Sequence, residues 1–345
     1  MTNISKKILR LMIILLLFGG VIVYRSVYVV TGDLKTSGVV TIGQGMSVRG
    51  IGEMLIKEGI LHSNTFFVHY LSFRHLDTAI QHGEMILDPP YTIASVARQI
   101  TTRQISKERE ITILPGWDIA DIGAYLEAQG ITTLSSWFSV VGSPTVRDVN
   151  RAYDVRSVPP FEHTPQDVSL EGYLRPDTYR IFQSASTEQI VDKLVHARAD
   201  QFSKDMLRDI EAQGRMVHEM LTMASIIEKE VRTPADRRLV SDIFWRRVEA
   251  GMGLQADSTI HYLAGNSGSV FTTQAQRTID SPWNTYKYAG LPPGPISNPS
   301  LDAIMAAIYP EQNEYWYFLT TLDTGEVKYG RTLDEHNENV AKYLR

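Results

Sequence analysis

The 345-residue chain contains no cysteine, which excludes a disulfide framework, thiolate metal ligands and a cysteine nucleophile. Its nine histidines are scattered and form no HExxH pair or similar ligand spacing, so we expect neither a bound metal nor another cofactor. The sequence also lacks a GxSxG motif, a P-loop and a dinucleotide-binding glycine pattern. These absences leave several common classes of nucleophilic, nucleotide-dependent and redox enzymes without support.

Long runs of charge of one sign are absent as well, and the formal net charge is only -5. The composition therefore gives no reason to expect nucleic acid as a partner. Hydrophobic residues make up 43% of the chain, which is enough for well-filled cores in two or three domains.

One long hydrophobic run is present, and it lies at the N-terminus. Residues 11–24 carry no charge and would span about 21 Å as a helix, short of the roughly 30 Å hydrocarbon core of a bilayer. Neighbouring apolar residues extend the run to 8–30 if Arg10 and Arg25 stretch their charged ends to the lipid surface. A cleaved signal peptide is the alternative, but no pair of small residues with cleavage-site spacing follows. We therefore predict an uncleaved transmembrane anchor over residues 8–30.

The flanking cations set the expected orientation of this anchor. Lys6, Lys7 and Arg10 precede the apolar run and outnumber the nearby Arg25 on its other side. Because cytoplasmic flanks are the more basic ones, residues 1–7 should be the cytoplasmic tail of a single-pass protein of the cytoplasmic (inner) membrane. The rest of the chain is then expected on the periplasmic or extracellular side.

Two segments of the chain, 39–60 and 110–131, match each other at a constant offset. Each has apolar residues typical of a strand, then a glycine, a capping Ser or Asp, an amphipathic helical pattern and a terminating glycine. The pattern predicts a pair of small α+β modules, at 39–105 and at about 110–145. The first is similar to LysM-type modules, which bind N-acetylglucosamine-containing glycans. A spacer or docking domain without a sugar site is the alternative.

The stretch LTMASIIEKE, residues 221–230, places a carboxylate in an unusual position. In a helix, the residues three and four positions before Glu228 are Ser225 and Ala224, so Glu228 lies on a largely apolar stripe. A carboxyl group held away from water there would have a raised pKa, which makes Glu228 a candidate proton donor near neutral pH. The alternative is a helix-end glutamate paired with Arg232.

Two loops after this helix, at 254–262 and 281–300, are dense in proline, glycine, asparagine and aromatic residues. Long loops held on a rigid helical scaffold are commonly functional. Trp283, Asn284 and Tyr286 suit a sugar polymer, because aromatic rings cover pyranose faces and amides bond to hydroxyl and acetamido groups. We therefore predict that these loops form a glycan-binding cleft next to the glutamate.

Glycoside hydrolases generally need a second carboxylate as base or nucleophile. Glu230, Asp257 and Glu171 are all available, and their spacing marks none of them. His336 and Asn337, near the C-terminus, are interpreted as a cap of the preceding hairpin rather than as residues of the cleft.

Five motifs occur in the order and approximate spacing of a known family. They are ASIIEKE (224–230), LQADSTIHY (254–262), NTYKYAGLPPGPISNP (284–299), EYWYFLTT (314–321) and EHN (335–337). From about Val39 to the C-terminus, the chain resembles the YceG-like family of endolytic murein transglycosylases. The resemblance implies an α+β chain in which a YceG-like catalytic domain at 106–345 follows the anchor and the LysM-like module.

The resemblance also implies an activity. Such an enzyme cleaves nascent peptidoglycan strands internally, between N-acetylmuramic acid and N-acetylglucosamine, and leaves a 1,6-anhydromuramoyl end that terminates the strand. Glu228 would protonate the glycosidic oxygen and then, as the carboxylate, take the proton of the muramoyl 6-hydroxyl, so no second carboxylate is required. The expected substrate-binding residues are Gln255, Asp257, Asn284, Tyr286 and Trp283.

The implied partners are the glycan strands, the membrane and peptidoglycan synthases of the penicillin-binding type. Two other functions are retained as alternatives. One is a muramidase that hydrolyses the same bond, and the other is a non-catalytic wall-binding scaffold whose working part is the LysM-like module.

Overall fold

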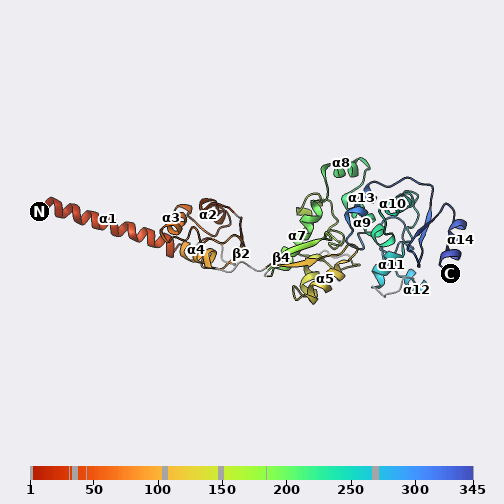
Figure 1. The fold of residues 1–345 in the computed structure, drawn as a ribbon, viewed down its shortest axis with the longest axis horizontal. Coiled ribbons are helices and arrows are strands. Elements are labelled where there is room, and N and C mark those ends of the chain that lie inside the picture. Colours follow the sequence, from red (N-terminus) through yellow and green to blue (C-terminus); the bar gives the residue numbers. More distant parts are fainter. Residues whose placement is uncertain are drawn as a thin grey trace. The chain divides into compact units, whose positions relative to one another are not determined.

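The structure is a computed structural model that describes residues 3–30, 32, 38–43, 45–102, 108–146, 151–183, 185–265 and 272–344. The chain divides into two compact units, Met1–Arg109 with Phe182–Ser184, and Glu110–Ile181 with Ala185–Arg345. Across the described residues the fold is mixed α+β and mostly helical, with strands in three two-stranded sheets (Figure 1). The predicted α+β class is confirmed at this level.

The first unit begins with α1 (Asn3–Tyr28). Its stretch Leu11–Tyr28 is long and apolar enough to cross a membrane, with a mean hydropathy of 2.1. A helix of this length and composition is consistent with a membrane anchor or with a signal sequence.

The remainder of the first unit is a small α+β fold. In chain order its elements are β1 (Gly38–Ile42), α2 (Val48–Lys57), α3 (Asn64–Phe73), β2 (Gly83–Leu87) and α4 (Ile93–Thr102). β1 and β2 pair antiparallel, with Gly38 opposite Leu87. Alternate strand residues such as Val40 face inward and pack with Leu55 and Phe67 of the helices. The order strand, helix, helix, strand is the one that the LysM-like prediction requires, and sugar binding by this unit stays a prediction.

The second unit contains the larger core. Its elements are β3 (Glu108–Thr112), which begins in the first unit, α5 (Ile119–Ala128), α6 (Leu134–Val141), the short 3-10 helix η1 (Val155–Ser157), β4 (Thr178–Phe182), α7 (Thr187–Ala199), α8 (Lys204–Ala212), α9 (Val217–Glu230), α10 (Pro234–Glu249), α11 (Asp257–Ala264), α12 (Gln274–Arg277), α13 (Leu301–Ile308), β5 (Tyr317–Thr320), β6 (Val327–Gly330) and α14 (Leu333–Tyr343).

The second copy of the repeat is an integral part of this unit. Asp118 caps α5 in a reciprocal pair with Asp121, as the sequence pattern predicts, and Gly116 before it adopts a φ of 79° that favours glycine. Its strand β3 pairs with β4, a strand from far along the chain. The second copy of the repeat therefore supplies one strand of this two-stranded sheet and does not form a separate module.

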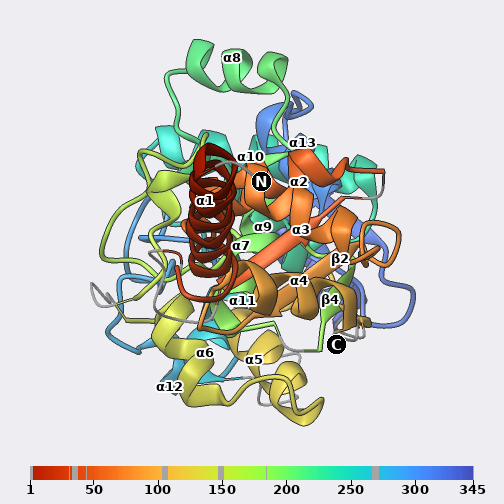
Figure 2. The ribbon, with the colours of Figure 1, turned by 90° about the vertical axis from the view of Figure 1, so that its left-hand side faces the viewer.

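The helix α9 is the one around which the second unit is built. Every residue from Met220 to Ile227 is buried, so the helix is enclosed on all sides rather than along one face. It packs against α13, α10, α11 and α8. Figure 1 shows α13 and α10 next to it, and Figure 2 shows α10 and α13 side by side from a second direction.

The end of α9 determines where its glutamates lie. Val231 is extended, and Thr233 accepts a hydrogen bond from Asp236 N at 3.1 Å to begin α10, so α9 stops at Glu230. Glu228 therefore lies in the last turn of a buried helix, at one end of the core.

Candidate active site

Glu228 has partners on both carboxylate oxygens, and its side chain is only 7% exposed. Arg237 Nη2, in the first turn of α10, donates to Oε1 at 2.7 Å. Ser300, the N-cap of α13, donates to Oε2 from its backbone N–H at 2.9 Å and from its hydroxyl at 2.5 Å. The Glu228 carboxylate is shielded from water as expected, but it is engaged in an ion pair. The ion pair resembles the alternative interpretation of a paired helix-end glutamate, but its partner is Arg237 rather than Arg232.

A second arginine lies close to the same group. Arg198 is fully buried, and its Nη2 donates to the carbonyl oxygens of Pro299 at 2.8 Å and Leu174 at 3.2 Å. Burial lowers the pKa of Arg198, and the negative charge of Glu228 opposes this effect. Glu228 therefore compensates the positive charge of the buried Arg237, and its hydrogen bonds to Ser300 fix the start of α13.

Glu230, the last residue of α9, has different surroundings. Its Oε1 accepts a hydrogen bond from Ser258 N at 3.2 Å, in the first turn of α11. Burial raises the pKa of Glu230 above its usual value, and the charge of Asp257 raises it further. Hydrogen bonding from Ser258 and the charge of Arg247 act in the opposite direction. Glu230 therefore keeps its proton to a higher pH than an ordinary glutamate, as a general acid requires.

Arg247, on α10, joins the elements that surround Glu230. It is buried and donates to Leu254 O at 2.7 Å and to Trp316 O from Nε at 3.1 Å. Its guanidinium lies over the Tyr317 ring of β5, 5.3 Å from the centroid. Since Leu254 belongs to the loop before α11 and Trp316 directly precedes β5, Arg247 holds both segments against α10.

The hairpin β5–β6 and the helix α14 form a further aromatic contact next to Arg247. The His336 ring stacks on Tyr317 with 5.4 Å between centroids, and burial lowers the pKa of His336. His336 therefore packs on the hairpin, whereas Asn337 is exposed.

Asp257 and Tyr286 are brought together at the start of α11. Asp257 Oδ1 accepts hydrogen bonds from Tyr286 OH at 2.8 Å, from Thr272 Oγ1 at 2.6 Å and from Arg277 Nη2 at 3.3 Å. The guanidinium of Arg277 lies over the Tyr286 ring at 4.8 Å. Asp257 and Tyr286, both predicted as site residues, thus belong to one hydrogen-bonded cluster. The charge of Asp257 acts on the neighbouring Glu230.

Trp283 and Asn284 lie inside the loop rather than on its surface. Trp283 is buried and its Nε1 donates to Gly294 O at 3.2 Å. Asn284 is fully buried, and its Nδ2 donates to the carbonyl oxygens of Arg277 at 2.9 Å and Ile279 at 2.8 Å. Direct contact of these two side chains with a sugar does not fit this arrangement, because their polar groups are already bonded to the backbone. They hold the loop in shape instead.

Gln255 is exposed and has a φ of 53°, a left-handed conformation that a glutamine rarely adopts. Its backbone N–H donates to Thr285 O at 3.1 Å, and the adjoining residues 256–258 lead into the Ser258 contact with Glu230. A strained non-glycine residue with an exposed side chain near a half-buried carboxyl group is typical of a functional position.

Replacing Gln255 with glycine should raise the free energy of unfolding by up to about 1 kcal/mol, because glycine adopts a positive φ without strain. Gln255→Ala keeps the strain and removes the same amide, so it is the matched control. If the amide binds substrate, both variants should lose cleavage activity, whereas only the glycine variant should gain stability in urea unfolding. Full activity in both would exclude the side chain from the site.

Glu171 is enclosed in the core, and this placement removes it as a free second carboxylate. It accepts hydrogen bonds from Ile119 N at 3.1 Å, Asn298 Nδ2 at 2.9 Å and Tyr262 OH at 3.3 Å. Burial raises its pKa well above the usual value. Since Asn298 Nδ2 also donates to Trp117 O at 3.1 Å, Glu171 helps to hold the loop before α13.

Sequence reasoning missed the residues that supply the electrostatics of the site, namely Arg198, Arg237, Arg247 and Ser300. One signal for two of them was available. Arg237 and Arg247 lie on α10 among buried residues such as Val240 and Phe244, and an arginine on the apolar face of an amphipathic helix indicates a buried ion pair.

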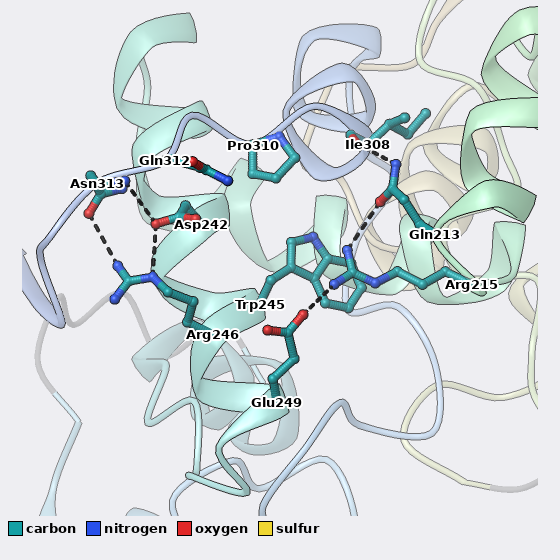
Figure 3. Close-up of a pocket in the computed structure, with 10 residues that line it drawn as sticks. All are labelled: Gln213, Arg215, Asp242, Trp245, Arg246, Glu249, Ile308, Pro310, Gln312 and Asn313. Atoms are coloured by element: carbon teal, nitrogen blue, oxygen red, sulfur yellow. Dashed lines mark hydrogen bonds and ion pairs between the residues drawn. The ribbon is translucent and has the colours of Figure 1, made fainter.

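A hollow of about 670 Å³ lies elsewhere in the second unit (Figure 3). Figure 3 shows its charged side chains pairing among themselves, with Arg215 bonded to Glu249 and Arg246 to Asp242. The lining residues are Gln213, Arg215, Asp242, Trp245, Arg246, Glu249, Ile308, Pro310, Gln312 and Asn313. Neither candidate glutamate lines this hollow, so it is separate from the candidate active site.

Comparison with known proteins gives consistent matches. The sequence profile of the YceG-like family matches residues 40–342. An endolytic murein transglycosylase of Bacillus subtilis (strain 168) is 28% identical over 333 residues, covering 95% of this chain and 91% of that protein. The protein of the same name from Streptococcus pneumoniae (strain ATCC BAA-255 / R6) is 28% identical over 343 residues, and the match covers 95% of this chain but 62% of that protein.

A solved structure agrees with the sequence matches. The crystal structure of a yceG-like protein from Listeria monocytogenes is 29% identical, with a TM-score of 0.57, and the match covers 88% of this chain and 99% of that one. Because the family match extends over most of both units, this chain belongs to the YceG-like family.

Proposed function

We propose that this chain is a membrane-anchored endolytic murein transglycosylase that cleaves within glycan strands and leaves 1,6-anhydromuramoyl ends. The names of its relatives support the reaction class. The observation on which the proposal depends is Glu230, a half-buried carboxyl group with a raised pKa beside the first turn of α11. Glu230 belongs to the ASIIEKE motif, and Ser258, which bonds to it, belongs to LQADSTIHY.

We favour Glu230 over Glu228 as the proton donor. Both oxygens of Glu228 are held by Arg237 and Ser300, and its charge compensates the buried Arg237, so its role is structural. The carboxyl group of Glu230 accepts a hydrogen bond from the N–H of Ser258, and its partial burial raises its pKa. Glu228, the residue chosen from the sequence, stays the alternative, and the two glutamine variants discussed below distinguish them.

In the proposed mechanism one carboxyl group acts twice. Glu230 donates its proton to the glycosidic oxygen as the bond from that oxygen to the muramoyl anomeric carbon breaks. The resulting carboxylate then takes the proton of the muramoyl 6-hydroxyl as that oxygen bonds to the anomeric carbon, which regenerates the acid. Ser258 N–H and Arg247 stabilise the carboxylate, whereas Asp257 favours the acid form. No water enters the products.

The substrate contacts proposed for this site are fewer than those expected from the sequence. Gln255, which is exposed, and the Asp257–Tyr286 pair are the residues we propose to contact the glycan. Trp283 and Asn284 position the loop that carries Tyr286, since Asn284 Oδ1 accepts from Tyr286 N at 3.0 Å.

The decisive experiment is a digest of purified murein strands by the full chain in detergent. Mass spectrometry should find products with anhydro ends, which are one water lighter than the reducing ends that a muramidase leaves. Reducing ends would favour the hydrolase instead. An absence of cleavage with glycan binding retained would favour the wall-binding scaffold.

Asp257→Asn should move the alkaline limit of cleavage to lower pH. Donation needs the protonated form of Glu230, and after burial the charge of Asp257 is a further cause that raises the pKa of Glu230. Without that charge Glu230 loses its proton at a lower pH, so activity falls earlier as pH rises. Asparagine keeps an oxygen that can accept from Tyr286 and Thr272. The pH dependence of kcat/KM is the measurement, and an unchanged alkaline limit contradicts the assignment.

We also propose residues 8–30 as an uncleaved anchor, with residues 1–7 in the cytoplasm and both units on the other side of the membrane. The helix α1 supports this arrangement by its length and composition. In this position the protein could reach newly made glycan strands, and peptidoglycan synthases are the partners we propose for it. The LysM-like module at 39–105 and the catalytic domain at 106–345 complete the proposed organisation.

A further inference from the structure

The helix α1 leads into the first unit without a linker. The uncharged run ends at Tyr24, and Val27, only three residues later, is 4% exposed and belongs to the core of that unit. Three helical residues rise about 4.5 Å, whereas the polar layer on each side of the hydrocarbon is about 5–7 Å thick. If α1 spans the membrane with the charged end of Arg25 at the lipid surface, the core of the first unit therefore begins within the layer of lipid headgroups.

The helix α3 packs on the end of α1 and runs back toward the membrane. Beyond α1, Gly32 lies against Ile60, since a Cβ added to Gly32 would be 2.2 Å from the Ile60 carbonyl oxygen. Within α1, the Tyr28 ring meets Tyr70 of α3, with centroids 6.2 Å apart. The two contacts, Gly32 with Ile60 and Tyr28 with Tyr70, thus run in opposite directions along the two segments. Figure 1 shows α3 beside the end of α1, in agreement with the packing of these two helices.

The last residues of α3 continue in the same direction. Phe73 and Arg74 lie three and four positions after Tyr70, so they project from the same side of the helix about one turn further on. One turn before Tyr28 in α1 are Tyr24 and Arg25, at the boundary of the apolar run. Phe73 and Arg74 are therefore level with this boundary.

The composition of this end of α3 fits lipid rather than water. Phe73 is 82% exposed, and the Arg74 guanidinium lies over the Tyr70 ring at 6.0 Å. Tyrosine and tryptophan are enriched where a membrane meets water, helices that lie in this region bury phenylalanine in it, and arginines there meet the lipid phosphates. Tyr24 and Arg25 on α1, and Phe73 and Arg74 on α3, thus place two aromatic residues and two arginines at about the same level.

We propose that the C-terminal end of α3, Tyr70 to Arg74, is a membrane-contact surface that seats the first unit in the lipid headgroup layer. This inference depends on the proposed anchor. It limits the movement of the first unit, because a module held by both α1 and α3 cannot swing freely away from the bilayer.

The absence of cysteine from the chain allows a clean test. Three single-cysteine variants of the full chain, Phe73→Cys, Glu58→Cys and Leu16→Cys, are labelled with an environment-sensitive fluorophore and reconstituted in phospholipid vesicles that contain anionic lipid. Nitroxide-labelled lipids and aqueous iodide serve as quenchers. Glu58 is exposed and adjoins the Ile60 end, which the geometry places away from the lipid, so it is the matched control.

Lipid nitroxide should quench position 73 about twofold or more over position 58, with iodide showing the opposite order. Equal quenching at 73 and 58, with position 16 protected by lipid, would overturn the contact surface and leave the anchor intact. Accessibility of position 16 to iodide would overturn the anchor itself, and the inference with it.

Discussion

Glu230→Gln should reduce glycan cleavage by about 10²- to 10⁴-fold, the range typical of a lost general acid. Glutamine fills the same space and can accept the hydrogen bond from Ser258 N, but it has no proton to donate. The release of soluble fragments from purified murein by equal amounts of the full chain and the variant measures the loss.

Stability provides the control for folding in this variant. Because burial raises the pKa of Glu230, the folded chain keeps the proton at pH values where the unfolded chain has lost it. The unfolded chain then binds fewer protons, so Glu230 lowers stability progressively as pH rises from the usual glutamate pKa through the raised one. Glutamine cannot ionise. The melting temperature of Glu230→Gln at neutral pH should therefore equal or exceed that of the parent, and near-parental cleavage by a folded variant would exclude Glu230 as the acid.

Glu228→Gln should act on stability instead, with a loss of about 3–5 kcal/mol in the free energy of unfolding. The substitution leaves Arg237 as a buried cation without the carboxylate that pairs with it. Glutamine also cannot match a carboxylate that accepts three hydrogen bonds from Arg237 and Ser300. Urea unfolding, followed by tryptophan fluorescence, measures the difference.

A double variant separates this effect from general damage to the core. If the cost arises from an unpaired cation, Glu228→Gln combined with Arg237→Gln should be less destabilised than the sum of the two single variants. Additive losses would contradict the ion-pair explanation. Below its unfolding transition, Glu228→Gln should retain most of its cleavage activity. A well-folded Glu228→Gln variant without activity, beside an active Glu230→Gln variant, would return the catalytic role to Glu228.

The local structure of much of this chain follows from residues that are close together in the sequence. Three features were predictable in this way. They are the apolar N-terminal run, the apolar pattern before Glu228, and the repeated strand, turn and helix at 39–60 and 110–131. Their side-chain spacing and capping residues act over a few positions along the chain. The family membership was also predictable, because it depends on ordered motifs in the sequence.

The different surroundings of the two neighbouring glutamates, on which our choice of the acid depends, arise only in the folded chain. The partners of Glu228 lie 9 and 72 residues away, and Glu230 receives its hydrogen bond from a residue 28 positions later. The same is true of Asn284, whose exposed or buried state depends on how its loop folds over itself. Helical periodicity gives the direction of a side chain, whereas its charge state depends on burial and on groups that other elements bring near. Those contacts exist only after the chain has folded.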